Sequence, residues 1–473
     1  MTWVLLVAIP LASALALVIP RVGRQASTVL LATAAMTSIV AAAHAVLSGT
    51  APFLDGYVRG DETAQLFTPV INFIFTGIAV YVRARVAAEP ASRRFVFLAL
   101  AFLAAANLAL ISNHLLLMWI ALECTTLAAA LMIVRPDAPG SRLASWRYLL
   151  FSSVGLGLVL LGLVCLTRSM EIAQHVPTLF VDEMPAVVVG PTNAWRELGV
   201  GLIVLGIGTK LGLAPMYSWL PEAYDEAPAP VTAMLGAVQF NCALVMLFRI
   251  VHIYRPGSGA LITGELLTIG LASVAVSTVS IVATRNFKRL LAYASINHAG
   301  VIAIGLGLGN SASYGLLLYV LSNAFIKAVL FLTAGKIEAH YGTKDTKLIS
   351  GLIKDLPYSG LFLMVGTFAL LGFPPFGSFL GELLILSALV TSGQMFVFAA
   401  FCMLITMSFV ATGRTIFPMI WGEPKQARTW PRQRALGALH KLIFLGALLV
   451  LGIYIPPQIN SLITQVAHSL EAP

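Results

Sequence analysis

Long runs of apolar residues recur along the whole chain and are separated by short polar segments. We count fourteen runs, most of them close to the roughly 20 residues that a helix needs to cross a bilayer. The runs cover residues 2–20, 26–48, 64–82, 95–112, 115–134, 146–167, 197–214, 228–248, 261–283, 290–309, 313–335, 357–390, 392–420 and 435–455. This pattern predicts an all-α polytopic membrane protein with about fourteen transmembrane helices.

The composition excludes a water-soluble globular protein. Hydrophobic residues make up 59% of the 473 residues and charged residues 10%, whereas soluble domains carry roughly 25% charged residues. The longest polar stretches, 49–63, 168–196 and 421–434, are too short to fold alone. The first run has no basic segment before it, and Arg21 and Arg24 follow it. We therefore expect a retained span and not a cleaved signal peptide.

Lysine and arginine residues concentrate in alternate loops between the predicted spans. Odd-numbered loops hold 22 of the 29, even-numbered loops hold five, and the remaining two, Lys210 and Lys327, fall inside spans. Because cytoplasmic loops are enriched in cations, we expect the odd loops in the cytoplasm and both termini outside. The seventh loop is an exception, since it carries three acids and no cation: Glu222, Asp225 and Glu226.

Two spans contain proline and glycine where a helix should be continuous. The seventh runs into Pro215 and Pro221 soon after Lys210, and the twelfth contains GFPPFG before Glu382. Proline removes a backbone donor, so in lipid the freed groups need protein or water partners. One interpretation is that both residues are simply common in membrane helices. Matching breaks five helices apart indicate instead an inverted repeat around an ion pathway.

Such a repeat divides the single integral membrane domain, residues 1–473, into four parts. Residues 1–94 hold spans one to three, and 435–455 form the last span. Spans 4–8 lie in repeat one, 95–250, and spans 9–13 in repeat two, 261–420. Because five is odd, the two five-helix repeats, with broken helices 7 and 12, should run in opposite directions through the membrane.

Three charged residues lie well inside predicted spans. Glu123 is central to the fifth, where a carboxylate costs roughly 2–3 kcal/mol to insert and usually faces a bundle interior or water. Lys210 lies near the first break, and a Glu123–Lys210 pair would be either a proton switch or a static salt bridge. Lys327, in the eleventh span, either lines a channel or extends to the interface.

Two further ionisable residues complete a series. His298, in the tenth span, suits a proton relay because imidazole titrates near neutrality, although a lone histidine is often only hydrogen-bonded. Glu382 follows the second break and is either a proton exit group or a cap of the restarted helix. The order Glu123, Lys210, His298, Lys327, Glu382 predicts a proton relay. Lys288 and Arg289, just before the tenth span, we interpret as ordinary loop cations.

The four cysteines do not show the spacing of metal ligands, so we expect no metal and no other cofactor in this chain. Any redox chemistry would then take place on other subunits. The net charge of +9 is carried by the loops of a membrane protein, and we expect no nucleic-acid partner.

At these residues the sequence resembles the antiporter-like subunits of respiratory complex I, Mrp-type cation/proton antiporters and membrane-bound group 4 hydrogenases. The resemblance covers nearly the whole chain. Its strongest segments are KLGLAPMYSWLPEAYDEAPAPVTAMLGAV, RNFKRLLAYASINHAGVIAIG, NAFIKAVLFLTAGK and GFPPFGSFLGELLIL. Within the family, EAPAPVTAMLGAVQFNCALVMLFR is most similar to the F-type subunit of hydrogenase-4-like complexes. The resemblance implies fourteen helices, two inverted five-helix repeats and a place in the bacterial inner membrane.

The resemblance also implies roles for individual residues. Glu123 and Lys210 match the family's fifth-helix glutamate and seventh-helix lysine, Lys327 an eleventh-helix lysine, and Glu382 the exit position on the twelfth. The chain departs from the family at Asn241, where many members carry lysine or histidine in the eighth helix. Asparagine cannot titrate, so either a water bridges this point or the relay is weakened there.

Asn323 likewise stands where some members of the family have a histidine. We therefore treat Asn241 and Asn323 as candidate relay or water sites. The chain also ends soon after the last span, so we do not expect the long lateral helix of some distal members.

The leading hypothesis is a proton-translocating membrane subunit of a hydrogenase-4-like or complex I-like redox complex. Its expected partners are the lipid membrane, other membrane subunits of the same family, and peripheral redox subunits such as nickel–iron hydrogenase and iron–sulfur proteins. The alternatives are a subunit of a Mrp-type cation/proton antiporter and of a proton-driven inorganic-carbon uptake complex. A non-transporting anchor is disfavoured by the cost of the buried charges.

Overall fold

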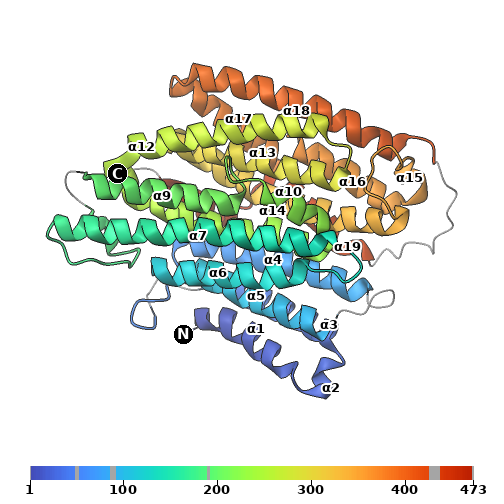
Figure 1. The fold of residues 1–473 in the computed structure, drawn as a ribbon, viewed down its shortest axis with the longest axis horizontal. Coiled ribbons are helices and arrows are strands. Elements are labelled where there is room, and N and C mark those ends of the chain that lie inside the picture. Colours follow the sequence, from blue (N-terminus) through green and yellow to red (C-terminus); the bar gives the residue numbers. More distant parts are fainter. Residues whose placement is uncertain (1, 48–52, 86–91, 189–191, 425–436, 471–473) are drawn as a thin grey trace.

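The computed structural model describes residues 2–47, 53–85, 92–188, 192–424 and 437–470. Helices provide the regular structure in these ranges, apart from a few isolated β-bridges. The long helices lie side by side along one axis, with α1 (Leu5–Ala16) near one edge of the bundle and α18 (Met395–Trp421) at the opposite edge (Figure 1). The predicted all-α polytopic fold is confirmed.

The N-terminal half is a series of apolar helices joined by short loops. They are α2 (Pro20–Gly23), α3 (Ala26–Leu47), α4 (Glu62–Arg85), α5 (Arg93–Ile111), α6 (Leu115–Ile133), α7 (Gly140–Ile172) and α8 (Met184–Val187). Side-chain caps fix several starts, as at α5, where the Ser92 hydroxyl accepts a hydrogen bond from the Phe95 amide at 3.1 Å. Glu62 in the first turn of α4 and Arg85 in its last complement the helix dipole.

Both predicted helix breaks are present. The first separates α9 (Ala194–Leu211) from α10 (Trp219–Glu226), and the second separates α16 (Pro357–Leu370) from α17 (Gly377–Thr391). Gly212 and Gly372 end the leading helices at φ +76° and +67°, a left-handed conformation that glycine adopts without steric cost. Each break also contains one cis peptide bond, before Pro215 and before Pro375.

The remaining helices form the centre and the C-terminal side of the bundle. They are α11 (Ala229–Ala233), the π-helix η2 (Met234–Gln239), α12 (Phe240–Ala283), α13 (Phe287–Leu308), α14 (Ser313–Tyr341), α15 (Leu352–Asp355), α19 (Leu439–Ile453) and α20 (Pro457–Leu470). A straight α12 would be about 66 Å long, twice the hydrocarbon thickness. Ser258 is non-helical and kinks it between the predicted eighth and ninth spans.

Among the described residues, nine helices are long and apolar enough to cross a membrane, and the pair α19 and α20, bent by 70°, makes a tenth. One of the nine is the segment 229–283, which the kink divides, and α1, α16 and α17 are shorter apolar helices. The count of fourteen and the two inverted repeats stay predictions. Lys425, Arg428, Arg432, Arg434 and the predicted span limits at 48 and 435 lie outside the described residues.

Glycine pairs bring several helices into backbone contact. A Cβ on Gly206 of α9 would lie 2.5 Å from the carbonyl oxygen of Gly155 on α7, and one on Gly162 would lie 2.7 Å from the carbonyl oxygen of Gly199. Without a hydrophobic force between helices in lipid, this close packing is a main source of cohesion. It holds α9, and with it Lys210, directly against α7.

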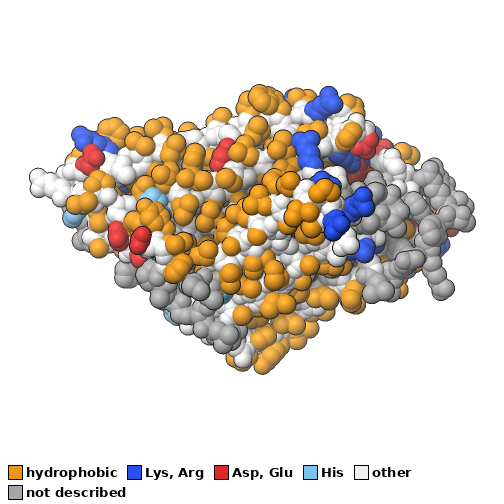
Figure 2. Space-filling view, turned by 90° about the horizontal axis from the view of Figure 1, so that it is seen from below, with side chains coloured by type: hydrophobic (Ala, Val, Ile, Leu, Met, Phe, Trp, Pro, Cys, Tyr) orange, Lys and Arg blue, Asp and Glu red, His pale blue; other side chains and the backbone are white. Residues whose placement is uncertain are grey.

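Charge is distributed unevenly along the bundle. The face in Figure 2 is largely hydrophobic in the middle, and most of its lysine and arginine side chains lie toward one end. We call this the cation-rich end; α15 lies toward it (Figure 1). Both chain ends lie toward the other end of the bundle (Figure 1).

Candidate proton relay

Lys210 is buried in the first half of the bundle, in the last turn of α9. Its side chain is 4% exposed, and its Nζ donates a hydrogen bond to the hydroxyl of Thr126 on α6. The ammonium also lies 5.4 Å from the centre of the Tyr148 ring on α7. Three helices therefore meet at Lys210 immediately before the first break.

Glu123 is not in direct contact with Lys210. No ion pair joins the two within the described part of the chain, although Glu123 lies one turn before Thr126 on the same helix. Its Oε1 accepts a hydrogen bond from the Ser153 hydroxyl at 2.8 Å, and its Oε2 has no partner among the described residues. Lys210 is thus bonded to Thr126, one turn from Glu123, and a static Glu123–Lys210 salt bridge is absent from these residues.

Gln239 joins the surroundings of Lys210 to the centre of the bundle. Its Oε1 accepts from the Tyr148 hydroxyl at 2.9 Å, and its Nε2 donates to Thr125 Oγ1 at 2.8 Å. Gln239 is the last residue of η2, and it is buried. The sequence did not point to this residue, because glutamine cannot titrate and the helical register across η2 was not visible.

Asn241, two residues further on, does not extend this network. Its Nδ2 donates to the carbonyl oxygen of Ala237 in its own helix at 2.7 Å, and its Oδ1 has no partner among the described residues. A π-helix contains one extra residue per turn and rotates the following side chains. Gln239, and not Asn241, therefore makes the hydrogen bonds to Tyr148 and Thr125, while Asn241 stays a predicted relay or water site.

Lys327 lies at the centre of the bundle on α14 and is 2% exposed. Its Nζ lies 3.7 Å from the centre of the Phe240 ring and has no hydrogen-bond partner in the described ranges. A Cβ at Gly236 of η2 would lie 3.5 Å from Lys327 Cδ and 3.4 Å from the Tyr224 hydroxyl, so these side chains converge on the π-helix. Lys327 does not extend to the interface.

One face of α14 leads from Lys327 toward His298. Tyr319, Asn323 and Lys327 are spaced four residues apart and share that face. The Tyr319 hydroxyl lies 3.0 Å from His298 Nδ1, and His298 Nε2 lies 3.0 Å from the carbonyl oxygen of Leu370. Asn323 is buried between Tyr319 and Lys327 on this face, and its Oδ1 has no partner among the described residues.

Leu370 belongs to the second break, so His298 is hydrogen-bonded to the end of a half-helix. Neutral imidazole has one donor and one acceptor nitrogen, and the Leu370 carbonyl requires the proton on Nε2. In that tautomer Nδ1 accepts from Tyr319. Transfer of a proton through His298 would exchange these two roles.

Glu382 closes the series on α17. A small cavity of about 20 Å³ is lined by Glu382, His298 and Tyr319 together with residues of α18, and it is large enough for one water molecule. The Glu382 carboxylate also approaches the backbone of the break, since a Cβ at Gly372 would lie 2.8 Å from Oε2. His298 and Glu382 are therefore brought together. Glu382 does not cap α17, since it lies beyond the first turn of this helix.

The acids of the seventh loop are paired at the cation-rich end. Asp225 accepts from Lys344 and Arg289, each at 2.9 Å, while Lys288 contacts Glu338 at 3.0 Å and the Asp225 carbonyl oxygen at 2.6 Å. Burial alone would raise the pKa of Asp225, but Lys344 and the hydrogen bonds that the carboxylate accepts hold its pKa below the usual range. These contacts explain why the loop lacks its own cations.

The interpretation of Lys288 as an ordinary loop cation was wrong, since its side chain is 2% exposed and fully engaged. The count of two cations inside spans was also too low. Arg249 lies within α12, where it pairs with Asp61 at 2.8 Å, and Lys441 lies buried within α19. Arg249 falls one residue beyond the predicted run 228–248, because the sequence does not give helix ends to within a turn. Lys441 was counted with the preceding loop although it lies inside the predicted run 435–455.

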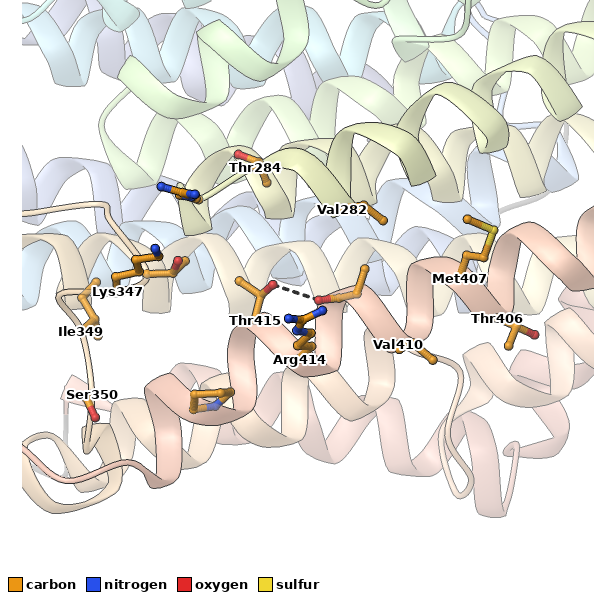
Figure 3. A pocket seen from close by; sticks show the side chains of 14 residues that line it. Val282, Thr284, Lys347, Ile349, Ser350, Thr406, Met407, Val410, Arg414 and Thr415 are labelled. Atoms are coloured by element: carbon orange, nitrogen blue, oxygen red, sulfur yellow. Dashed lines mark hydrogen bonds between the residues drawn. The ribbon is translucent and has the colours of Figure 1, made fainter.

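A wide groove lies away from these residues. It has a volume of about 740 Å³ and opens at the surface between the end of α12, the segment after α14, and α18 (Figure 3). Lys347 and Arg414 line it together with Val282 and Met407. None of the predicted relay residues contributes to this groove.

Comparison with known proteins identifies the family. Residues 112–408 match the family described as NADH:quinone oxidoreductase/Mrp antiporter, TM, and the chain belongs to this family. It is 32% identical to the Hydrogenase-4 component F homolog of Methylacidiphilum infernorum (isolate V4), over 84% of this chain and 86% of the relative. It is 25% identical to a subunit of the Na(+)/H(+) antiporter of Bacillus subtilis (strain 168), over 84% and 80% respectively. The predicted family is confirmed.

Solved structures share the fold. A chain of the membrane-bound sulfane sulfur reductase, an archaeal respiratory membrane complex, has a TM-score of 0.89 and 24% identity, with 99% of this chain and 98% of that chain covered. A chain of the Mrp complex from Dietzia sp. DQ12-45-1b has a TM-score of 0.86 and 20% identity, with 99% and 97% covered. At such identities the likeness concerns the fold alone. It extends over 99% of this chain in both cases.

Proposed function

We propose that this chain is a proton-translocating membrane subunit of a multisubunit hydrogenase-4-like or complex I-like redox complex. The observation that carries this proposal is the line of polar side chains from Lys327 through Asn323, Tyr319 and His298 to Glu382. Each member is enclosed in an apolar bundle, where a charged or unpaired group is costly. A series of such groups leading to a water-sized cavity supports conduction better than a structural role.

In the first half, Lys210 is the group that changes partner. It is held by Thr126, one turn from Glu123, and the Tyr148–Gln239 bond lies beside it. A negative charge on Glu123 favours the protonated lysine, and movement of the lysine away from Glu123 favours proton release. Released protons would pass along Gln239 and bound water toward Lys327.

The direction of transport follows from the charge asymmetry of the loops. We assign the cation-rich end to the cytoplasm, both termini to the outside, and the protein to a bacterial inner membrane. Protons would be taken up near Lys210 and released outward near Glu382.

The partners in this proposal are other membrane subunits of the same family and peripheral redox subunits. The solved relatives belong to multisubunit membrane complexes. Glu123 is only half-buried, and α6 and α7 expose apolar side chains beside it, including Leu127 and Val154. A neighbouring subunit on this face would act on Glu123 directly, and redox chemistry elsewhere in the complex would bias Lys210 through it.

Purification in a mild detergent, followed by mass spectrometry of the co-purifying subunits, tests the assignment. Nickel–iron hydrogenase or other iron–sulfur redox subunits are the expected result. Recovery of antiporter partners alone, with sodium-dependent proton movement in vesicles, would select the Mrp-type function instead. A co-purifying zinc protein would select inorganic-carbon uptake.

Alanine substitution of Glu123 or Lys210 tests the mechanism within the purified complex. Each should abolish proton pumping while the complex remains assembled and its redox turnover continues. Normal pumping by both variants would contradict the proposed switch.

A further inference from the structure

A third lysine, Lys441, is buried where the relay above does not use it. It lies near the start of α19 with 0% of its surface exposed. Its Nζ donates to Thr333 Oγ1 on α14 at 3.3 Å and lies 4.9 Å from the centre of the Phe362 ring on α16. No carboxylate pairs with it among the described residues. A hydroxyl and an aromatic face are weak partners for a fully enclosed ammonium group.

The neighbouring His440 is equally unusual. It is 4% exposed, and neither Nδ1 nor Nε2 has a hydrogen-bond partner among the described residues. Its ring lies edge-on to Tyr81 of α4, with centroids 6.0 Å apart, and to Phe444 one turn further along α19. Two unpaired imidazole nitrogens stand beside a lysine that has one long hydrogen bond and no carboxylate partner among the described residues. Water is the partner that would complete this polar cluster.

The cluster lies along α14 between the cation-rich end and Lys327 of the predicted relay. Thr333 is six residues after Lys327 on α14, so Thr333, to which Lys441 donates, lies about 9 Å from Lys327 along the helix axis. Three or so hydrogen-bonded waters, at ~2.8 Å spacing, span that distance. In the other direction, Lys336 contacts the carbonyl oxygen of Gly437 at 3.4 Å.

Among the described residues, the groups that contact the cluster are cationic or neutral. Lys336 on α14 and Arg85 on α4, which donates to the Tyr81 hydroxyl at 3.2 Å, stand on the cation-rich side. Repulsion between Lys336 and Lys441 opposes a permanent charge on both. This repulsion would favour the transfer of a proton from Lys441 inward, toward Lys327.

We propose that His440 and Lys441 form a second proton-uptake branch, which leads from the cation-rich end past Thr333 to Lys327 without passing Lys210. This inference rests on the proposed proton-translocating function. The sequence offers no other use for Lys441, since methionine or leucine would fill the same space at lower cost.

Thiol labelling of the whole complex in membrane vesicles tests the water path without reference to pumping. With the four native cysteines replaced by alanine, Lys441→Cys should react with 2-aminoethyl methanethiosulfonate added on the cation-rich side, with methanesulfinate as the leaving group. Lys354→Cys, at an exposed position of the short helix α15 at the same end, is the positive control. Leu448→Cys, on the same helix as Lys441 and with 0% exposed surface, is the dry control. Labelling of Lys441→Cys at least tenfold faster than Leu448→Cys is expected, and equal rates would overturn the branch.

Chemical rescue tests the role of the amine. Unlabelled Lys441→Cys should pump at least fivefold more slowly than the cysteine-free parent. Aminoethyl labelling, which rebuilds an ammonium group, should restore pumping, whereas labelling with ethyl methanethiosulfonate, which adds similar bulk without the amine, should not. Full activity of the unlabelled variant, or equal rescue by both reagents, would overturn the proposal. Lack of pumping by the parent would instead refute the proposed function, while the labelling rates would still report on the water path.

Discussion

Replacement of Gln239 by leucine should interrupt the relay while the fold is retained. Leucine has a similar volume but neither accepts from the Tyr148 hydroxyl nor donates to Thr125, so two hydrogen bonds of 2.9 and 2.8 Å are lost. The Tyr148 hydroxyl is left buried without its acceptor, which costs about 1–3 kcal/mol. If that cost appears in the barrier for transfer toward Lys327, pumping slows by about 5- to 150-fold, because each 1.36 kcal/mol is tenfold in rate.

Asn241→Leu is the matched control two residues along the same helix. Asn241 bonds only to the carbonyl oxygen of Ala237 in its own helix, so its loss should change pumping less than twofold. Proton pumping per redox turnover in inside-out vesicles, with the amount of assembled complex measured on native gels, separates the two variants. A large loss of pumping in Asn241→Leu together with normal pumping in Gln239→Leu would refute the assignment of Gln239 as the bridging residue.

Three further predictions concern the scaffold. Gly206→Ala should destabilise the purified complex by about 1–3 kcal/mol, because its Cβ would overlap a backbone carbonyl, whereas Gly157→Ala, with nothing within 4 Å, should be neutral in thermal denaturation. Arg249→Met should cost about 3–5 kcal/mol, because it leaves Asp61 and two carbonyl groups without their buried cation. The pKa of Asp225 is lower in the folded protein than its unfolded-state value of about 3.9. The ion pairs of Asp225 therefore stabilise the protein fully above pH ~3.9, and this stabilisation is lost as the pH falls through the lower folded-state pKa. Asp225→Asn should therefore lower the free energy of unfolding at pH 7, and this free energy should fall less steeply as the pH is lowered.

Each of these predictions has a clear contrary result. Equal melting temperatures of Gly206→Ala and Gly157→Ala would mean that the contact between α7 and α9 does not limit packing. A stable Arg249→Met variant would mean that water replaces the guanidinium. If the stability of Asp225→Asn fell in acid as steeply as that of the parent, groups other than Asp225 would be responsible for the acid sensitivity.

The fold was largely predictable because lipid imposes simple rules on sequence. Apolar runs of the required length located the helices, and proline with glycine located both breaks, since few alternatives satisfy backbone groups in a membrane. Lys210, Lys327 and Glu382 stood out because a charge in an apolar run is costly whatever its partners are. His298 and Glu382 proved to share one small cavity, which spacing along the chain could not show.

What could not be predicted depended on helix register and on contacts between distant segments. The π-helix before Phe240 places Gln239, and not Asn241, against Tyr148 and Thr125, and no periodicity reveals one extra residue in a helix. Lys441 was counted with the basic loop that precedes it, although it lies inside the predicted run 435–455, and its contacts with α14 and α16 could not be seen from the sequence. Lys288 was misjudged for a related reason, since its acidic partners come from other segments of the chain.

Substitution of Lys327 by methionine tests the central claim most directly. In inside-out vesicles that contain the complete complex, proton pumping per redox turnover is compared between Lys327→Met, the parent and Lys354→Met, an exposed control. The relay predicts loss of pumping in Lys327→Met, with the complex assembled, and normal pumping in Lys354→Met. Normal pumping by an assembled Lys327→Met complex would contradict it.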